Sequence, residues 1–216
     1  MLHPDRLLPP DPEVRRVARS IYDGTCALPL VSPHGHIDPA GLADDTPIGD
    51  PATELITRDH YLLRMAYSQG VPLEALGVRP LEDHGDPPPV DGRAVWRTLA
   101  EHYDLFLGTP SKLWLDHTLG EVFGIDDRLG PDSADDVYDE VSGRLAEDRF
   151  RPRALYERFG VEFLATTDGA LDPLDAHARI RASGWPGTVV PTFRPDDVVD
   201  PDGPHFLENL GRLAEL

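Results

Sequence analysis

The feature that most constrains the fold is an alternation of helix and strand patterns in the last third of the chain. It predicts, in order, a helix, a strand, a helix and a strand over residues 153–160, 161–168, 172–184 and 188–196. Such alternation is typical of parallel strands that are joined by helical crossovers. We therefore predict an α/β fold, in which polar side chains at the carboxyl ends of the strands form the functional site.

Two histidines follow a further predicted strand nearer the N-terminus. The apolar run "ALPLV", residues 27–31, predicts this strand, and His34 and His36 come soon after it. Residues two apart in an extended chain point to the same face, so both imidazoles would aim the same way. Imidazole pairs bind divalent metals such as zinc, but two histidines that only form hydrogen bonds in a polar loop fit this spacing equally well.

The two later strands also end in polar side chains. Thr167 and Asp168 close one strand, and Arg194 lies near the end of the other. Asp168 can orient a ligand, cap the next helix or contact a substrate, and Arg194 can form an ion pair with Asp196. Three strand ends that carry polar residues favour a functional site more strongly than any one of them.

Helical patterns fill most of the remaining chain. We predict helices over residues 11–24, 50–71, 94–108, 111–125, 132–148 and 205–216. The proline-rich stretch 83–92 predicts an irregular loop, because proline fixes φ and supplies no amide donor.

These elements are too few for a closed (β/α)8 barrel, which takes roughly 250 residues. We expect the N-terminal part of such a TIM barrel, with its C-terminal strands absent. Residues 26–38 would form the first barrel strand and a metal-site loop, 39–150 a mainly helical insertion between the first and second strands, and 151–216 further β/α units.

The charge of the chain restricts its partners. Lys and Arg total 20 against 39 Asp and Glu, so the net charge is −19. This charge repels phosphate backbones and anionic lipids, so we expect neither a nucleic acid nor a membrane partner. An anionic substrate would need a local cation in the site. The single cysteine and the lack of a long apolar stretch lead us to expect a cytoplasmic protein.

Several longer segments resemble the uronate isomerase (glucuronate isomerase) family of the amidohydrolase superfamily. They occur in the family's order and are "HGHIDP", "RDHYLLRMAYSQGV", "LWLDHTLGEVFGI", "FGVEFLATTD", "DPLDAHARI" and "PTFRPD". The paired histidines resemble the first metal motif of the superfamily. Two positions depart from the pattern: Ser32 replaces a usual aspartate, and Gly169 replaces a usual acidic residue. Because of these two departures, a substrate that differs from that of the family stays an alternative.

The resemblance implies a reaction and roles for named residues. The reaction is the interconversion of D-glucuronate and D-fructuronate, and of D-galacturonate and D-tagaturonate, through an enediol. His34 and His36 would hold a divalent metal, with zinc as the first choice, and no redox cofactor is implied. Arg194 and Asp168 would bind the sugar acid, with the planar guanidinium of Arg194 on its carboxylate.

The resemblance also implies that His60 and Tyr61 take part in substrate binding and proton transfer. The residues alone favour a capped helix start with an aromatic side chain packed against the barrel. A full-length protein could form a homo-oligomer. Two other functions stay open: a metal-dependent hydrolase of the same superfamily, because a two-histidine site can also activate water, and a noncatalytic truncated fragment that binds sugar acids.

Overall fold

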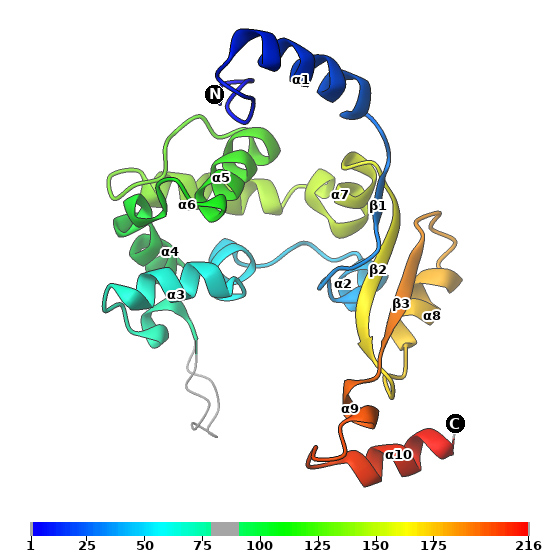
Figure 1. The fold of residues 1–216 in the computed structure, drawn as a ribbon. Coiled ribbons are helices and arrows are strands. Elements are labelled where there is room, and N and C mark those ends of the chain that lie inside the picture. The colour runs from blue at the N-terminus through cyan, green and yellow to red at the C-terminus, as the bar shows by residue number, and fades with distance from the viewer. Residues whose placement is uncertain (1, 79–90, 216) are drawn as a thin grey trace. The chain divides into compact units, whose positions relative to one another are not determined.

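The protein is described by a computed structural model, which covers residues 2–78 and 91–215. The chain forms two compact units, which are described separately: Met1–Ala18 with Pro47–Phe150, and Arg19–Thr46 with Arg151–Leu216 (Figure 1). Of the irregular loop that we predict for residues 83–92, residues 83–90 lie outside the described part.

The second unit contains a parallel sheet of three strands in the order β1-β2-β3. The strands are β1 (Leu30–Ser32), β2 (Val161–Gly169) and β3 (Val189–Arg194). Gly169 pairs with Arg194, so the ends of β2 and β3 lie at the same edge of the sheet. The predicted α/β class and the parallel strands are confirmed.

The first strand is shorter than predicted. Residues 27–29 do not join the sheet, because the amide of Leu28 donates to the carbonyl of Thr25 at 3.0 Å and closes a turn after the preceding helix. Pro29 has no amide to donate to a neighbouring strand. The strand therefore begins only at Leu30, whose amide donates to the carbonyl of Gly160 at 2.8 Å.

Further helices of this unit lie between the strands and after β3. Their bounds are α2 (Pro39–Asp44), α7 (Pro152–Arg158), α8 (Asp175–Ala182), α9 (Asp196–Val199) and α10 (Phe206–Ala214). A core cluster of Leu42, Tyr156, Leu164 and Ile180 joins α2, α7 and α8 to β2. The helices that we predict over 153–160, 172–184 and 205–216 are confirmed, whereas the short α2 and α9 lack a clear apolar repeat and are not predicted.

The first unit is helical. Its elements include 3-10 and π turns and are η1 (Thr53–Thr57), α3 (His60–Ser68), η2 (Leu73–Leu76), α4 (Gly92–Glu101), η3 (Tyr103–Phe106), α5 (Pro110–His117), η4 (Thr118–Phe123), α6 (Ala134–Leu145) and η5 (Asp148–Phe150). Helix α1 (Pro12–Thr25) begins in this unit and is capped by Asp11, which accepts the amide of Val14 at 2.9 Å. Side chains less than 2% exposed fill the interior, among them Trp96, Leu99, Tyr103, Phe106, Val137, Val141 and Phe150.

The single helix predicted over residues 50–71 is wrong. The π-helical turn η1 ends at Thr57, and α3 begins at His60. The carboxylate of Asp59 accepts the amides of Tyr61 at 2.8 Å and Leu62 at 3.2 Å. This cap replaces the carbonyls that a continuous helix would offer to those amides, so the chain starts a new helix. Within residues 2–78 and 91–215, no helix is long and apolar enough to cross a membrane.

Candidate functional site

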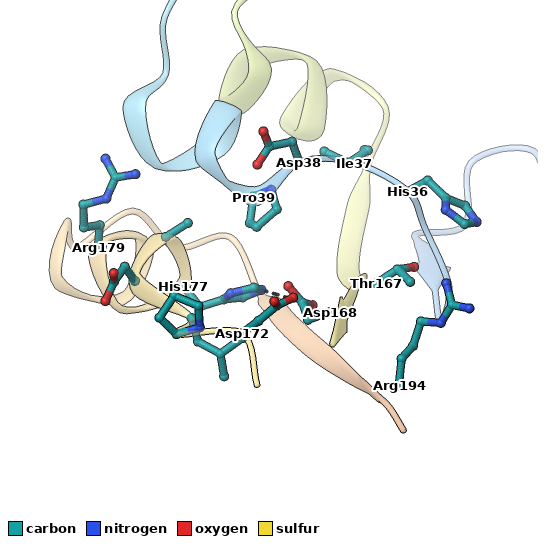
Figure 2. A pocket seen from close by; sticks show the side chains of 14 residues that line it. His36, Ile37, Asp38, Pro39, Thr167, Asp168, Asp172, His177, Arg179 and Arg194 are labelled. Carbon is teal, nitrogen blue, oxygen red and sulfur yellow. Dashed lines mark ion pairs between the residues drawn. The ribbon is translucent and has the colours of Figure 1, made fainter. Parts of the chain in front are cut away.

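A cavity of about 650 Å³ lies at the carboxyl ends of the strands in the second unit (Figure 2). It is lined by residues 36–39 after β1, by 167–168 and 172–177 at the end of β2 and beyond, by Arg179 of α8 and by Arg194 of β3. The structure therefore brings three of the predicted side chains, His36, Asp168 and Arg194, to one cavity.

The two predicted metal ligands converge. The Nε2 atoms of His34 and His36 lie 3.0 Å apart, with ring planes at 87°. Strand alternation, which the sequence predicts as the cause of this convergence, is not the cause. Residues 33–38 are irregular, and the strand has already ended at Ser32. Ser32 is one of the two positions that depart from the family pattern. Its hydroxyl donates to the carbonyl of His34 at 3.2 Å and so supports the backbone that carries the two histidines.

The glycine between the histidines lies against the second strand. The hydroxyl of Thr167 donates to the carbonyl of Gly35 at 2.7 Å. A Cβ atom at Gly35 would lie 3.2 Å from the carbonyl oxygen of Ala165, which is closer than most real Cβ contacts. Glycine therefore allows the segment to approach β2, and this approach turns both imidazoles to one place.

The pair has a geometry that suits two ligands of one metal ion. Two nitrogen ligands about 2.0–2.1 Å from a tetrahedral zinc lie about 3.3 Å apart, close to the separation of the two Nε2 atoms. A complete site needs more donors. No group of three His, Cys, Asp or Glu side chains with metal-binding geometry occurs in the part of the chain that the structure covers.

Arg194 fits both of its interpretations. Its Nε donates to Asp196 at 2.9 Å, which is the simple ion pair, and the side chain also lines the cavity. The side chain is 50% exposed. Since the ion pair with Asp196 uses Nε, the two terminal nitrogens of the guanidinium have no hydrogen-bond partner within residues 2–78 and 91–215 and can bind a planar anion.

Asp168 lies in a small buried network. Its Oδ2 accepts the hydroxyl of Thr166 at 2.6 Å, and that hydroxyl lies 2.8 Å from Nε2 of His177. Asp168 does not cap the next helix, because the N-cap of α8 is Leu174, with φ +56 and no side-chain cap. Figure 2 shows the imidazole of His177 directed toward Asp168, at 3.9 Å between Nε2 and Oδ2.

Sequence reasoning misses three residues of this site: Thr166, His177 and Asp172. A signal for His177 exists, because it precedes the apolar Ile180 by three positions and shares its buried helix face. Asp172 lies in the loop after β2, and its carboxylate accepts the amide of Gly169 at 2.7 Å. It places an acidic group beside the position where the family pattern has an acidic residue.

His60 and Tyr61 belong to the first unit. They form the start of α3, Tyr61 is 63% exposed, and the two rings lie 4.1 Å apart between centroids. The capped helix start is confirmed. The residues that line the cavity of Figure 2 all come from the second unit, and a catalytic role for His60 and Tyr61 stays a prediction.

The chain is similar to uronate isomerases along its whole length. The uronate isomerase of Rhizorhabdus wittichii is 56% identical over 215 residues, which cover 100% of this chain and 44% of the relative. The uronate isomerase of Mesorhizobium japonicum is 53% identical over 213 residues, which cover 99% of this chain and 45% of the relative. The chain thus spans less than half the length of these relatives.

Solved structures and a family model agree with these relatives. The glucuronate isomerase from Caulobacter crescentus superposes with a TM-score of 0.93 at 46% identity, and the uronate isomerase from Thermotoga maritima with 0.85 at 25%. Each alignment covers 100% of this chain and 44% of the solved one. The family model for glucuronate isomerase matches residues 13–216. The chain therefore belongs to the glucuronate isomerase family.

Proposed function

We propose that the protein isomerises hexuronates, converting D-glucuronate to D-fructuronate and D-galacturonate to D-tagaturonate. The observation that carries this proposal is one cavity lined by an imidazole (His36), a buried carboxylate (Asp168) and an arginine (Arg194), with the imidazole of His34 converging on that of His36. The first two groups suit the polar oxygens of a sugar, and the third suits its carboxylate. The hydrolase alternative gains no support, because the relatives named above are isomerases.

The chemistry requires four proton transfers, one at each of the carbons C1 and C2 and one at each of the oxygens O1 and O2. A base removes the proton from C2 of the open-chain aldose while an acid protonates O1, which gives the enediol. Loss of the proton from O2 and protonation of C1 then give the ketose. His60 and Tyr61 are the groups that we propose for these transfers, because imidazole and phenol can both give and accept protons.

The binding roles follow from the cavity. The guanidinium of Arg194 holds the carboxylate of the sugar acid, and Asp168 accepts a hydroxyl of the substrate. His34 and His36 would hold a divalent metal such as zinc, which would supply Lewis-acid polarisation of the sugar oxygens. No nucleic acid or membrane takes part, and the substrate is a small sugar acid of the cytoplasm.

We further propose that the parallel sheet is part of a (β/α)8 barrel, with the helical first unit inserted between its first two strands. The support is that β1 pairs directly with β2, although Pro47–Phe150 of the first unit lie between them in the chain.

The test compares variants of Arg194 on glucuronate and on neutral glucose. Charge-assisted hydrogen bonds contribute roughly 1.5 to 3 kcal/mol each. We expect Arg194→Met to lose most uronate turnover and Arg194→Lys to keep part of it, because lysine restores the charge without the planar fork. The control is Arg179→Met, since Arg179 also lines the cavity but is already paired with Asp44. Wild-type protein that isomerises glucose as well as glucuronate, or Arg194→Met with intact uronate turnover, would contradict the proposal.

A further inference from the structure

The hydroxyl of Thr166 is the centre of the buried network beneath the cavity. Thr166 is 0% exposed. Its Oγ1 lies 2.6 Å from Oδ2 of Asp168, 2.8 Å from Nε2 of His177 and 3.3 Å from the carbonyl oxygen of Val190. A hydroxyl has one proton and can donate it to only one of these three atoms.

The direction of each hydrogen bond follows from counting protons. An ionised carboxylate only accepts, so the shortest contact requires Thr166 to donate to Asp168. Thr166 then has no proton left for His177, and the ring must donate from Nε2 to the hydroxyl oxygen. The opposite direction would leave two oxygen lone pairs facing each other at 2.6 Å unless Asp168 were protonated.

The other ring nitrogen indicates the protonation state of His177. Nδ1 is buried and has no hydrogen-bond partner among the residues that the structure describes. A neutral ring protonated at Nε2 leaves only a lone pair at this atom. A doubly protonated ring would bury both an unpartnered N–H group and a positive charge, which costs more free energy.

We propose that His177 and Thr166 form a relay of two hydrogen bonds that positions Asp168. His177, neutral and protonated at Nε2, donates to Thr166, and Thr166 donates to Oδ2 of Asp168. Oδ2 is thereby fixed, and Oδ1 is available to accept a substrate hydroxyl in the cavity that Asp168 lines. The effect on substrate rests on the proposed function, whereas the relay itself does not. His177 and Thr166 are positioning residues.

The first experiment examines the relay without any substrate. In ¹⁵N and ¹³C NMR spectra of this chain at neutral pH, the ring of His177 should show a proton on Nε2 and a bare Nδ1. The ring signals of His177 are assigned as those that disappear in the spectrum of His177→Gln. Thr166→Val keeps the side-chain volume but removes the hydroxyl, so it should shift the carboxyl ¹³C resonance of Asp168. A proton on Nδ1, or an unchanged Asp168 resonance in Thr166→Val, would overturn the relay.

The second experiment measures isomerisation of D-glucuronate by the full-length protein. Thr166→Val and His177→Leu should lower kcat/KM about tenfold, mainly through KM, which corresponds to about one hydrogen bond to a charged group. His177→Gln should recover most of this loss, because its amide N–H reaches a position similar to that of Nε2. Ile180→Val on the same buried helix face is the packing control and should change stability but not KM.

The outcomes separate the two proposals. A wild-type protein without uronate isomerase activity refutes the proposed function, and the spectra still decide the relay. Activity in His177→Leu equal to that of the wild type refutes the relay while the function stands. Equal losses in His177→Leu and His177→Gln indicate a packing role alone and also refute it.

Discussion

Single residues decide where the functional groups of this site point. The sequence predicts that His34 and His36 converge, and they do, but through a close approach of Gly35 to β2 rather than through strand alternation. Their spacing is local, so a sequence pattern can indicate it. The network of Thr166 and His177 depends on a contact between a strand and a helix, and only the helical spacing of His177 and Ile180 gives a local sign of it.

At the scale of residues we predict how the loss of His34 or His36 changes zinc binding. His34→Ala and His36→Ala should each lower the zinc affinity of the chain by at least tenfold, because each removes one of the two converging imidazoles. Equilibrium dialysis with metal analysis measures the bound zinc. His205→Ala is the matched control, since His205 is an exposed histidine beside Glu208 on the approach to α10. Unchanged zinc in both single variants and in the double variant would show that the pair is not a ligand pair.

Whole helices and strands are predicted best where a repeat and its end signals agree. The alternation after residue 151 is confirmed because each helix has an apolar face and is followed by a glycine with positive φ, as at Gly160 and Gly184. The prediction of one helix over residues 50–71 misses the break between η1 and α3, which the capped helix start favoured at His60 and Tyr61 does indicate, because Asp59 fits the polar face of a continuous helix as well as it fits a cap. The π-helical turns η1 and η4 have no sequence signal in the period of their apolar residues.

At the scale of elements we predict a pH effect on the pairing of α4 with α6. Arg97 and Arg93 on α4 form hydrogen bonds with Asp135 on α6 and hold the pKa of its carboxyl below its usual value. A lowered folded pKa stabilises the protein above the unfolded value, about 3.9, and this contribution disappears as the pH falls through the folded pKa. Asp135→Asn should therefore be less stable than the wild type at pH 7, and the difference should shrink below about pH 4.

Urea unfolding across this range measures the difference. Asp136→Asn is the control, because Asp136 is exposed on the same helix and forms no recorded ion pair within the described ranges. The side chains of Asp135, Arg93 and Arg97 are about a third to a half exposed, so a small effect is expected. A difference between Asp135→Asn and the wild type that stays constant from pH 7 to about pH 3 would contradict the assignment.

The arrangement of the whole molecule is the part that sequence patterns describe least. The parallel direction of the strands follows from their helical crossovers, but the pairing of β1 with β2 also depends on long-range packing, such as that of Leu42 with Leu164. No local pattern encodes such a contact. Net charge, in contrast, is a property of the complete sequence, and its consequences for stability can be argued directly.

We predict that salt stabilises this protein. With 39 acidic against 20 basic side chains and a net charge of −19, repulsion between like charges exceeds the attraction of ion pairs such as those of Arg93 and Arg97. Folding concentrates these charges, and salt screens them, since the Debye length falls from about 30 Å at 0.01 M to about 10 Å at 0.1 M. A gain of about 1 kcal/mol would raise Tm by about 2–4 °C in a chain of this size. Thermal unfolding in NaCl and in KCl at equal ionic strength should give the same rise, because screening depends on ionic strength and not on the cation. A Tm that falls over this range would mean that the ion pairs, and not the excess of acidic charge, dominate the electrostatic free energy of folding.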